Sequence, residues 1–354
     1  ELEGLLNDHG ARVAISWDKT ASTLEKLRST TPLETIVSVN MVDAMPPLKR
    51  LALRLPIPPL AAKREQLTEH APNTVAWSTL IGSAIGGDGS ALEMPRISQA
   101  DVALILYTSG TTGKPKGGML SHGNLIANCV QGQAWVPEMG KHKERFLAAL
   151  PMFHAYGMTT LCIFSVYMGA ELILLPSPQM PLILDIVKKR TPTWLPGVPT
   201  LYQKIMDAAE DKDVDLSGIR NAFSGAATLP VEIVERWESM TGGRLVEGFG
   251  MTECSPVLIG NPMNGKNRPG YVGLPFPDAE VRIANPKNLD ETQPDGQPGE
   301  LLARGPQIFQ GYFGNQEATE ESFHNGWFRT GDIGIKDATG RITIVDRTKD
   351  LVIR

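Results

Sequence analysis

The sequence predicts an α/β protein of layered, mostly parallel sheets covered by helices, with a smaller β-rich part after them. Short apolar runs of strand length alternate with helical segments up to about residue 260, which is typical of parallel strands joined by crossover helices. From Asn261 onward, short strands are separated by Pro- and Gly-rich turns. A Gly- and Thr-rich loop follows one apolar run near residue 107, and the other elements are placed around it.

The composition is that of a globular chain rather than a disordered or nucleic-acid-binding one. Of its 354 residues, 42% are hydrophobic and 21% are charged, which suffices for two or three units with their own cores. The formal net charge of -5 argues against nucleic acid as the main partner. Cys129, Cys162 and Cys254 lie far apart without paired spacing, which indicates reduced thiols and a cytoplasmic location.

The first hundred residues contain α/β elements and one ambiguous stretch. A helix is expected over residues 1–10, and strands over 12–16 and 36–42. Residues 45–64 are rich in proline and interleave basic with apolar side chains. That pattern would suit a membrane-surface element, but prolines break a long helix and favour an irregular surface excursion. We expect the irregular excursion, with the membrane-surface element as the alternative.

The middle of the chain alternates regularly. Ser121 is expected to cap a helix over residues 124–135, before a strand over 146–150. The longest apolar stretch, 157–175, is interrupted by polar residues, and therefore predicts a buried helix and a strand over 171–175 rather than a membrane span. Helices then follow at 182–190, 199–210 and 230–241, with strands at 193–195, 220–223 and 244–247. The β-rich part is expected to hold strands at 281–284, 299–304 and 341–345.

The loop after the strand at residues 103–107 combines glycines, hydroxyls and lysines. Glycines let the backbone approach a ligand and turn its N–H groups inward, which makes an anion-binding concavity. The hydroxyls add donors, and the lysines add charge that can follow a leaving pyrophosphate. A flexible polar surface loop is the alternative, but the coincidence of all these groups favours a phosphate site. Its residues are Thr108, Ser109, Gly110, Thr111, Thr112, Gly113, Lys114 and Lys116.

This loop differs from that of a P-loop NTPase, because Gly113-Lys114 is followed by Pro115 and Thr108 stands where the first glycine belongs. It resembles, nearly residue for residue, the phosphate loop of the adenylate-forming (ANL) superfamily of acyl-CoA synthetases, firefly luciferase and adenylation domains. Five later stretches are similar to motifs of that superfamily and follow in its order. They are PMFHAYG at 151–157, FSGAA at 223–227, GFGMTECSP at 248–256, GWFRTGDIG at 326–334 and DRTKD at 346–350.

The resemblance implies a nucleotide site beyond the loop. Thr252 would donate to a phosphate, Glu253 would be a hard oxygen ligand for Mg²⁺ together with Thr108, and Asp332, expected in a turn, would hold the ribose hydroxyls. Each of these could instead be an ordinary turn or cap residue. The residues implied for ATP or AMP are Gly225, Ala226, Ala227, Glu247, Gly248, Phe249, Gly250, Met251, Thr252, Asp332 and Arg347.

The resemblance also implies an acyl site and a hinge. Phe153, His154 and Tyr156 would lie at the mouth of the acyl pocket with Gly225 and Gly248, although a histidine beside aromatics is also compatible with an ordinary core residue. Lys349 would be the hinge residue. Together with the change of pattern near residue 260, this divides the chain into an α/β part at 1–260, a β-rich part at 261–345 and the start of a hinge at 346–354. The catalytic residues implied are Lys116, His154, Thr252 and Glu253.

Within the superfamily the sequence is most similar to bacterial long-chain fatty acyl-CoA synthetases. That similarity implies an AMP-forming ligase that uses ATP, Mg²⁺ and coenzyme A to convert a fatty acid to acyl-adenylate and then acyl-CoA. The nearest alternatives are a fatty acyl-AMP ligase and an aryl or amino-acid adenylation domain; a non-catalytic nucleotide- or acyl-binding module is a third. A homodimer is compatible with the sequence, and a peripheral position at the inner face of the membrane is the alternative to a purely cytoplasmic one.

The resemblance further implies that the complete enzyme continues at both ends, and that its C-terminal domain carries the lysine that completes adenylation. We therefore expect this chain to bind ATP but to be poorly active by itself.

Overall fold

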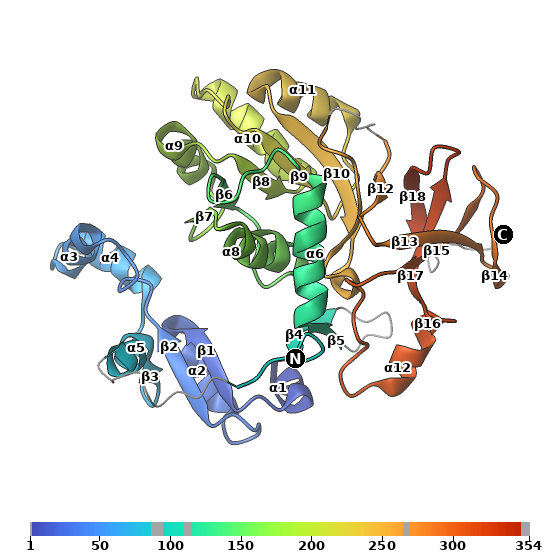
Figure 1. Ribbon diagram of the computed structural model, residues 1–354. Coiled ribbons are helices and arrows are strands. Elements are labelled where there is room, and N and C mark those ends of the chain that lie inside the picture. The colour runs from blue at the N-terminus through green and yellow to red at the C-terminus, as the bar shows by residue number, and fades with distance from the viewer. Residues whose placement is uncertain (1, 86–94, 109–114, 265–269, 348–354) are drawn as a thin grey trace. The chain divides into compact units, whose positions relative to one another are not determined.

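The computed structural model describes residues 2–85, 95–108, 115–264 and 270–347 (Figure 1). The chain forms two compact units, Glu1–Arg96 and Ile97–Arg354. Among the described residues, no helix combines the length and the apolar character needed to cross a membrane.

The first unit is built on a three-stranded parallel sheet. Its strands β1 (Val13–Trp17), β2 (Thr35–Val39) and β3 (Val75–Ala76) pair in that order. Helices α1 (Leu2–His9) and α2 (Asp18–Leu27) contribute Leu6, Ala21 and Leu24 to a small core with Leu33 and Ile36, and α5 (Trp77–Ile85) follows β3. The predicted first helix and first two strands are confirmed.

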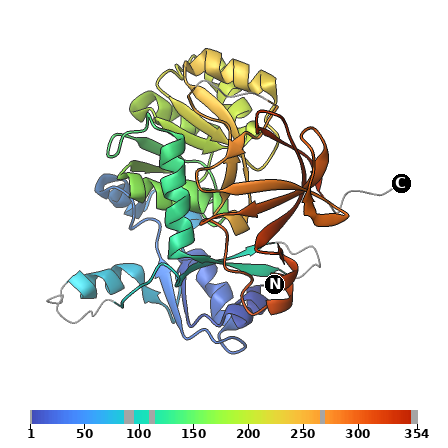
Figure 2. The same ribbon diagram turned by 45° about the vertical axis from the view of Figure 1, so that its right-hand side comes forward.

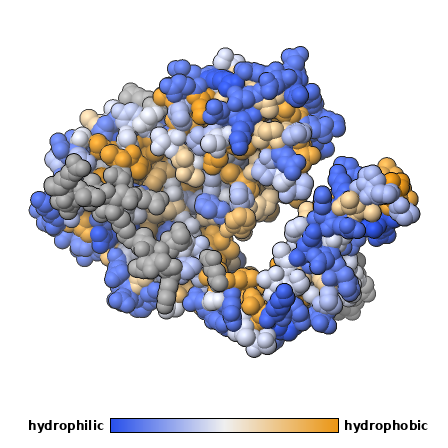
Figure 3. Space-filling view, turned by 180° about the vertical axis from the view of Figure 1, so that it is seen from behind, coloured by the Kyte–Doolittle hydropathy of each residue, from blue (hydrophilic) through white to orange (hydrophobic). Residues whose placement is uncertain are grey.

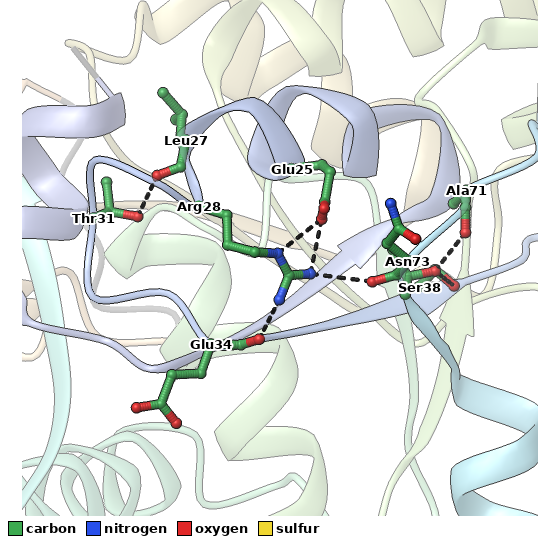
Figure 4. A network of polar contacts seen from close by, with 9 residues as sticks. Glu25, Leu27, Arg28, Thr31, Glu34, Ser38, Ala71 and Asn73 are labelled. Carbon is green, nitrogen blue, oxygen red and sulfur yellow. Dashed lines mark hydrogen bonds and ion pairs between the residues drawn. The ribbon is translucent and has the colours of Figure 1, made fainter.

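Arg28 ties three segments of this unit together (Figure 4). Its Nη2 lies 2.7 Å from Glu25 Oε2 and 3.1 Å from the Asn73 carbonyl oxygen, and its Nη1 donates to the Glu34 carbonyl. The end of α2 is thereby joined to the approaches of β2 and β3.

The prediction of an irregular excursion at residues 45–64 is wrong. The segment forms two helices, α3 (Pro47–Arg54) and α4 (Pro58–Leu67). Both begin with proline, at positions where a helix leaves its N–H groups without an intrahelical partner. The prolines therefore start two short helices instead of preventing them.

The second unit contains a seven-stranded sheet in the order β12-β11-β10-β9-β8-β6-β7. Five neighbouring strands are parallel, and the two at one edge are antiparallel. The parallel strands are β6 (Arg145–Ala148), β7 (Glu171–Leu174), β8 (Trp194–Gly197), β9 (Asn221–Ser224) and β10 (Arg244–Gly250); the edge strands are β11 (Val257–Gly260) and β12 (Leu274–Pro275). This agrees with the predicted mostly parallel sheet.

Helices cover both faces of this sheet (Figures 1 and 2). On one face, α9 (Met180–Arg190), α10 (Pro199–Asp211) and α11 (Val231–Thr241) pack on side chains such as Leu195; on the other, α6 (His122–Trp135) and α8 (Phe164–Met168) pack around Trp194. Trp194 and Leu195 are neighbours in β8 but belong to cores on opposite faces of the sheet, because side chains alternate across a sheet.

Helix α6 starts where the sequence predicts. The Ser121 hydroxyl accepts from the Asn124 N–H at 3.1 Å, and the Asn124 side chain accepts from the Ser121 N–H at 2.9 Å. This reciprocal capping box fixes the first turn.

The predicted buried helix after residue 157 is present but is not uniformly α-helical. It consists of α7 (Ala155–Gly157), a π-helix η1 (Met158–Ile163) and α8, and it ends at Gly169 with φ of 59°. The wider π-helical turn faces the core beneath α6 and shapes a cavity there.

A six-stranded sheet forms the β-rich part, with β14-β13-β15-β17-β16 in order and β18 beside β17, all antiparallel. The elements are β13 (Glu280–Asn285), β14 (Asn288–Thr292), β15 (Pro298–Arg304), α12 (Gln316–Glu321), β16 (Phe323–His324), β17 (Trp327–Lys336) and β18 (Ile342–Arg347). A hairpin, β4 (Val102–Thr108) and β5 (Lys116–Ser121), completes the unit. The boundaries proposed at residues 260 and 345 stay predictions.

Candidate functional site

The candidate nucleotide site lies at the carboxyl ends of β9 and β10, which are parallel neighbours and therefore end at the same edge of the sheet. Gly225–Ala227 follow β9, and Gly248 and Gly250 close β10. Ala226 has φ of +67°, an uncommon backbone conformation for a residue with a side chain. The sequence-predicted residues of these two segments are thus brought together.

Close packing explains the glycines of this edge. A side chain at Gly248 would place its Cβ 2.1 Å from Phe223 Cζ, and one at Gly250 would place it 1.9 Å from the Pro256 carbonyl oxygen. A methyl group at either position would displace the Phe223 ring or the Pro256 backbone.

Glu247 lies on this edge too, with only 6% of its surface exposed. Burial raises the pKa of its carboxyl to about 7, while a hydrogen bond from the Leu229 N–H at 3.2 Å acts in the opposite direction.

Glu253, Tyr312 and Lys116 form a cluster beside β5. Glu253 is buried in the 3₁₀ helix η2 (Thr252–Cys254), and its Oε1 accepts from the Tyr312 hydroxyl at 2.8 Å. The Lys116 ammonium lies 5.3 Å from the centre of the Tyr312 ring. A Cβ on Gly118 would lie 3.6 Å from Thr252 Cγ2, so Thr252 faces the same strand. Three residues predicted for phosphate and metal are thereby neighbours, and Tyr312 is one that sequence reasoning missed.

Asp332 reaches the same region from the antiparallel sheet. The prediction of a turn is wrong: Asp332 lies inside β17, is 5% exposed, and its N–H donates to Thr330 Oγ1 at 3.1 Å. Its backbone pairs with Arg347. Burial raises the pKa of the Cys254 thiol well above its usual range, and the charges of Glu253 and Asp332 raise it further. The two carboxylates therefore both act on Cys254.

Part of the predicted site cannot be placed. Thr108 is described, and its hydroxyl donates to the Lys116 carbonyl at 3.4 Å. The residues outside the described ranges are Ser109, Gly110, Thr111, Thr112, Gly113, Lys114 and Lys349.

The predicted acyl residues differ in exposure. Phe153 is 82% exposed, and His154 is exposed with its Nδ1 accepting from the Tyr156 N–H at 3.2 Å. Tyr156 is buried, and its hydroxyl donates to the Phe223 carbonyl. Its ring would lie 3.2 Å from a Cβ on Gly225, so only a residue without a side chain fits easily there.

An apolar cavity of about 40 Å³ lies between α6, η1 and the sheet. Cys129 and Gly132 line it from α6, and Val136 lines it from the residue after that helix. Their spacing of three and four residues is visible in the sequence, but it also fits ordinary core packing. Burial raises the pKa of Cys129 to about 12, so its thiol stays protonated. Phe223, from the FSGAA motif, also lines it. The remaining lining residues, which sequence reasoning did not single out, are Asn128, Trp135, Thr159, Thr160, Phe164, Trp194, Val257 and Phe276.

Among the described residues, no three His, Cys, Asp or Glu side chains form a group that could hold a metal ion. Mg²⁺ on a nucleotide usually needs only one or two carboxylates, because phosphates and water supply the other oxygens. The buried carboxylate of Glu253 meets that requirement.

Comparison with known proteins assigns the family of this chain. Residues 1–313 match the family of AMP-binding enzymes, so the chain belongs to that family. It is 35% identical over its whole length to a long-chain-fatty-acid–CoA ligase of Bacillus subtilis, and 33% identical to one of Escherichia coli. The chain spans 62% of the length of each of these relatives.

Solved structures show the same fold. ATP-bound MatB from Rhodopseudomonas palustris is 28% identical with a TM-score of 0.70, over 99% of this chain and 71% of that one. The anthranilate–CoA ligase AuaEII in complex with anthranoyl-AMP is 25% identical with a TM-score of 0.81, over 99% and 61% of the respective chains.

Proposed function

We propose that the protein activates a fatty acid with ATP and transfers the acyl group to coenzyme A. The observation that carries this proposal is the position of Phe223. Its ring closes over the Gly248 backbone on the nucleotide edge, and the same residue lines the apolar cavity. Tyr156 and Tyr202 both donate to its carbonyl, Tyr202 at 2.8 Å. A carboxylate whose apolar tail entered the cavity would therefore meet a nucleotide at this edge.

The proposed reaction has two steps. An oxygen of the fatty carboxylate forms a bond to the α-phosphorus of ATP while the bond to pyrophosphate breaks. The sulfur of coenzyme A then bonds to the acyl carbon, AMP leaves, and the thiol proton passes to solvent. The names of the fatty-acid ligase relatives support the acyl substrate, and the ATP-bound MatB structure supports the nucleotide.

In this proposal the residues act by position and charge. Lys116 and Thr252 would contact the phosphates, Asp332 would accept from the ribose hydroxyls, and Glu253 would hold Mg²⁺. When bound, Mg²⁺ would neutralise charge on the phosphates. The exposed His154 would lie where the carboxylate enters.

Binding of stable acyl-adenylate analogues tests the proposal against its nearest alternatives. We expect an octanoyl-sulfamoyl adenosine to bind this chain more tightly than the acetyl, phenylalanyl or benzoyl analogues, as measured by calorimetry. Each methylene buried contributes about 0.8 kcal/mol, or roughly fourfold in affinity. Tightest binding of the benzoyl or aminoacyl analogue would favour an aryl or amino-acid adenylation domain. A complete protein that acylates a carrier protein but not coenzyme A would be an acyl-AMP ligase.

We also propose that α3 and the start of α4 dock on an anionic lipid surface. Leu48 and Leu51, three residues apart in α3, are 82% and 63% exposed, and Leu55 and Ile57 between α3 and α4 are exposed as well. In Figure 3, where α3 and α4 lie at the right, apolar residues stand among hydrophilic ones at the tip of these two helices. Residues 45–64 contain five basic residues and no acidic one, so charge complementarity favours anionic lipid over a neutral protein surface.

Vesicle sedimentation tests this second proposal. The chain should bind phosphatidylglycerol-containing vesicles more than pure phosphatidylcholine ones, and replacing Leu48 and Leu51 by serine should remove the difference. Val166, equally exposed in the second unit at 81%, provides a matched control as Val166→Ser. If the double variant sedimented with phosphatidylglycerol vesicles as much as the unchanged chain, lipid docking would be contradicted. It would also be contradicted if the unchanged chain formed a dimer and the double variant were monomeric, because the leucines would then contact a second copy of the chain.

A further inference from the structure

Tyr312 contacts both charges of the candidate phosphate and metal site. Its hydroxyl donates to Glu253 Oε1 at 2.8 Å, and the Lys116 ammonium lies 5.3 Å from the centre of its ring. One half-buried aromatic side chain thus joins a cation and an anion that belong to different segments of the chain.

The backbone holds Tyr312 in this position from both sides. Residues 310–313 run antiparallel to β5: the Met119 N–H donates to the Gly311 carbonyl at 2.9 Å, and the Phe313 N–H donates to the Gly117 carbonyl at 2.7 Å. The Phe309 N–H donates to the Glu253 carbonyl at 2.9 Å. The segment carrying Tyr312 is therefore bonded directly to the strand that carries Lys116 and to Glu253 itself.

Side-chain contacts fix the ring as well. The Phe309 ring meets the Tyr312 ring edge to face, with centroids 4.9 Å apart. The Tyr312 N–H donates to Thr319 Oγ1 at 2.9 Å, which ties the residue to helix α12. Tyr312 is thus placed by α12 and Phe309 independently of any nucleotide.

This arrangement keeps the two charges separate while giving each a partner. A lysine and a glutamate that met directly would form an ion pair, and each would then have to leave the other to bind a phosphate or a metal. Among the described residues, no ion pair joins Lys116 to Glu253. The ring face attracts the ammonium, and the neutral hydroxyl donates to only one carboxylate oxygen.

We propose that Tyr312 is a positioning residue that orients Glu253 toward Mg²⁺ and holds Lys116 apart from it before Mg·ATP binds. This inference rests on the proposed function of the site and adds to it a residue that touches neither ATP nor the metal. Within the described contacts, Oε1 of Glu253 is the oxygen that accepts a side-chain hydrogen bond, so Oε2 is left for the metal.

Calorimetry of ATP binding with and without Mg²⁺ tests this role in the unchanged chain and in Tyr312→Phe and Tyr312→Leu. Tyr312→Phe keeps the ring under Lys116 but removes the hydrogen bond to a charged group, so the gain in affinity from Mg²⁺ should fall about tenfold. Tyr312→Leu removes the hydrogen bond to Glu253 and also the ring under Lys116. It should therefore lower the gain from Mg²⁺ as Tyr312→Phe does, and should also weaken ATP binding without metal more than Tyr312→Phe does.

Tyr167 provides a matched control. Its hydroxyl donates to Gln133 Oε1 at 2.8 Å, and the Lys141 ammonium lies 4.7 Å from its ring centre. Tyr167→Phe should leave the Mg²⁺ effect unchanged. A purely structural role would instead lower the melting temperature of Tyr312→Phe.

An undiminished gain from Mg²⁺ in Tyr312→Phe would overturn this inference while leaving the proposed function standing. Failure of the unchanged chain to bind ATP would overturn the proposed function, and this inference with it.

Discussion

The Glu247 carboxylate accepts a hydrogen bond from the Leu229 N–H at 3.2 Å, and this contact joins the end of β10 to the segment that leads into α11. The same segment contains Gly225–Ala227, which the sequence motifs predict to contact the nucleotide. A buried carboxyl therefore supports one wall of the candidate site.

Glu247 predicts a pH dependence of stability. Its pKa is raised by burial from an ordinary 4.5 to about 7, so the unfolded chain releases this proton first as the pH rises. The contribution of the protonated carboxyl is present in full below pH 4.5 and is lost as the pH rises to about 7, at a cost of about 3 kcal/mol. Relative to the unchanged chain, Glu247→Gln should therefore become more stable between pH 5 and pH 8.

Denaturant unfolding of both chains across this pH range measures the difference. Glu235→Gln, an exposed change on the same α11, is the control and should show no such trend. A difference between Glu247→Gln and the unchanged chain that stays constant with pH would show that Glu247 titrates normally.

Lys116 should contribute to ATP affinity. Loss of a hydrogen bond from a charged group costs about 1–3 kcal/mol, so Lys116→Ala should weaken ATP binding by that amount. Lys141 also lies over a tyrosine ring, 4.7 Å from the centre of Tyr167, which is not among the residues proposed for the phosphates, and Lys141→Ala should bind ATP normally. Equal affinities of Lys116→Ala and the unchanged chain in calorimetry would remove Lys116 from the site.

Glu253 should determine the response to Mg²⁺. Glu253→Gln keeps an oxygen that can accept from Tyr312 but loses the negative charge, so Mg²⁺ should no longer strengthen ATP binding while the melting temperature changes little. Glu300 is also buried, and its Oε1 lies 2.8 Å from Arg329 Nε. Glu300→Gln should show the reverse result, with a lower melting temperature and an intact Mg²⁺ effect. A large loss of stability in Glu253→Gln would point to a structural role for that carboxyl.

Local signals predicted most of the fold. Alternating apolar runs indicated the parallel strands, and Ser121 indicated the start of α6, because capping depends on a few neighbouring residues. These local signals failed where the same residues are compatible with two different local structures. Pro47 and Pro58 were expected to disrupt helices, yet they begin them. Asp332 was expected in a turn from its place in the stretch GWFRTGDIG, yet it lies in β17. Gly331, with φ of +73°, shows that the strand accommodates such a residue.

The candidate site was predicted in its motifs but not in the contacts between them. Thr252 and Glu253 could be named from one stretch of sequence, whereas Tyr312 lies 59 residues beyond Glu253 and carries no local signature. The cavity was missed for the same reason, since its lining comes from helices and strands spread over residues 128–276. Only tertiary packing brings such residues together.

Gly132 should control the size of the acyl group that the cavity accepts. It lies in α6 on the cavity wall, and a Cβ there would meet the Phe164 ring at an ordinary 3.7 Å. Gly132→Ala should therefore be tolerated, and should stabilise the chain by up to about 1 kcal/mol, because glycine is a poor helix former.

Gly132→Leu would project further into a cavity of about 40 Å³ and fill it. We expect it to weaken binding of an octanoyl-adenylate analogue about tenfold or more while binding of the acetyl analogue changes little, since displacing two methylenes already costs that much. Gly82→Leu, in α5 with nothing within 4 Å of its Cβ, is the matched control and should not change either affinity. If Gly132→Leu bound the octanoyl and acetyl analogues with an unchanged ratio, the acyl chain would have to lie elsewhere, and the cavity under α6 would be only a packing defect.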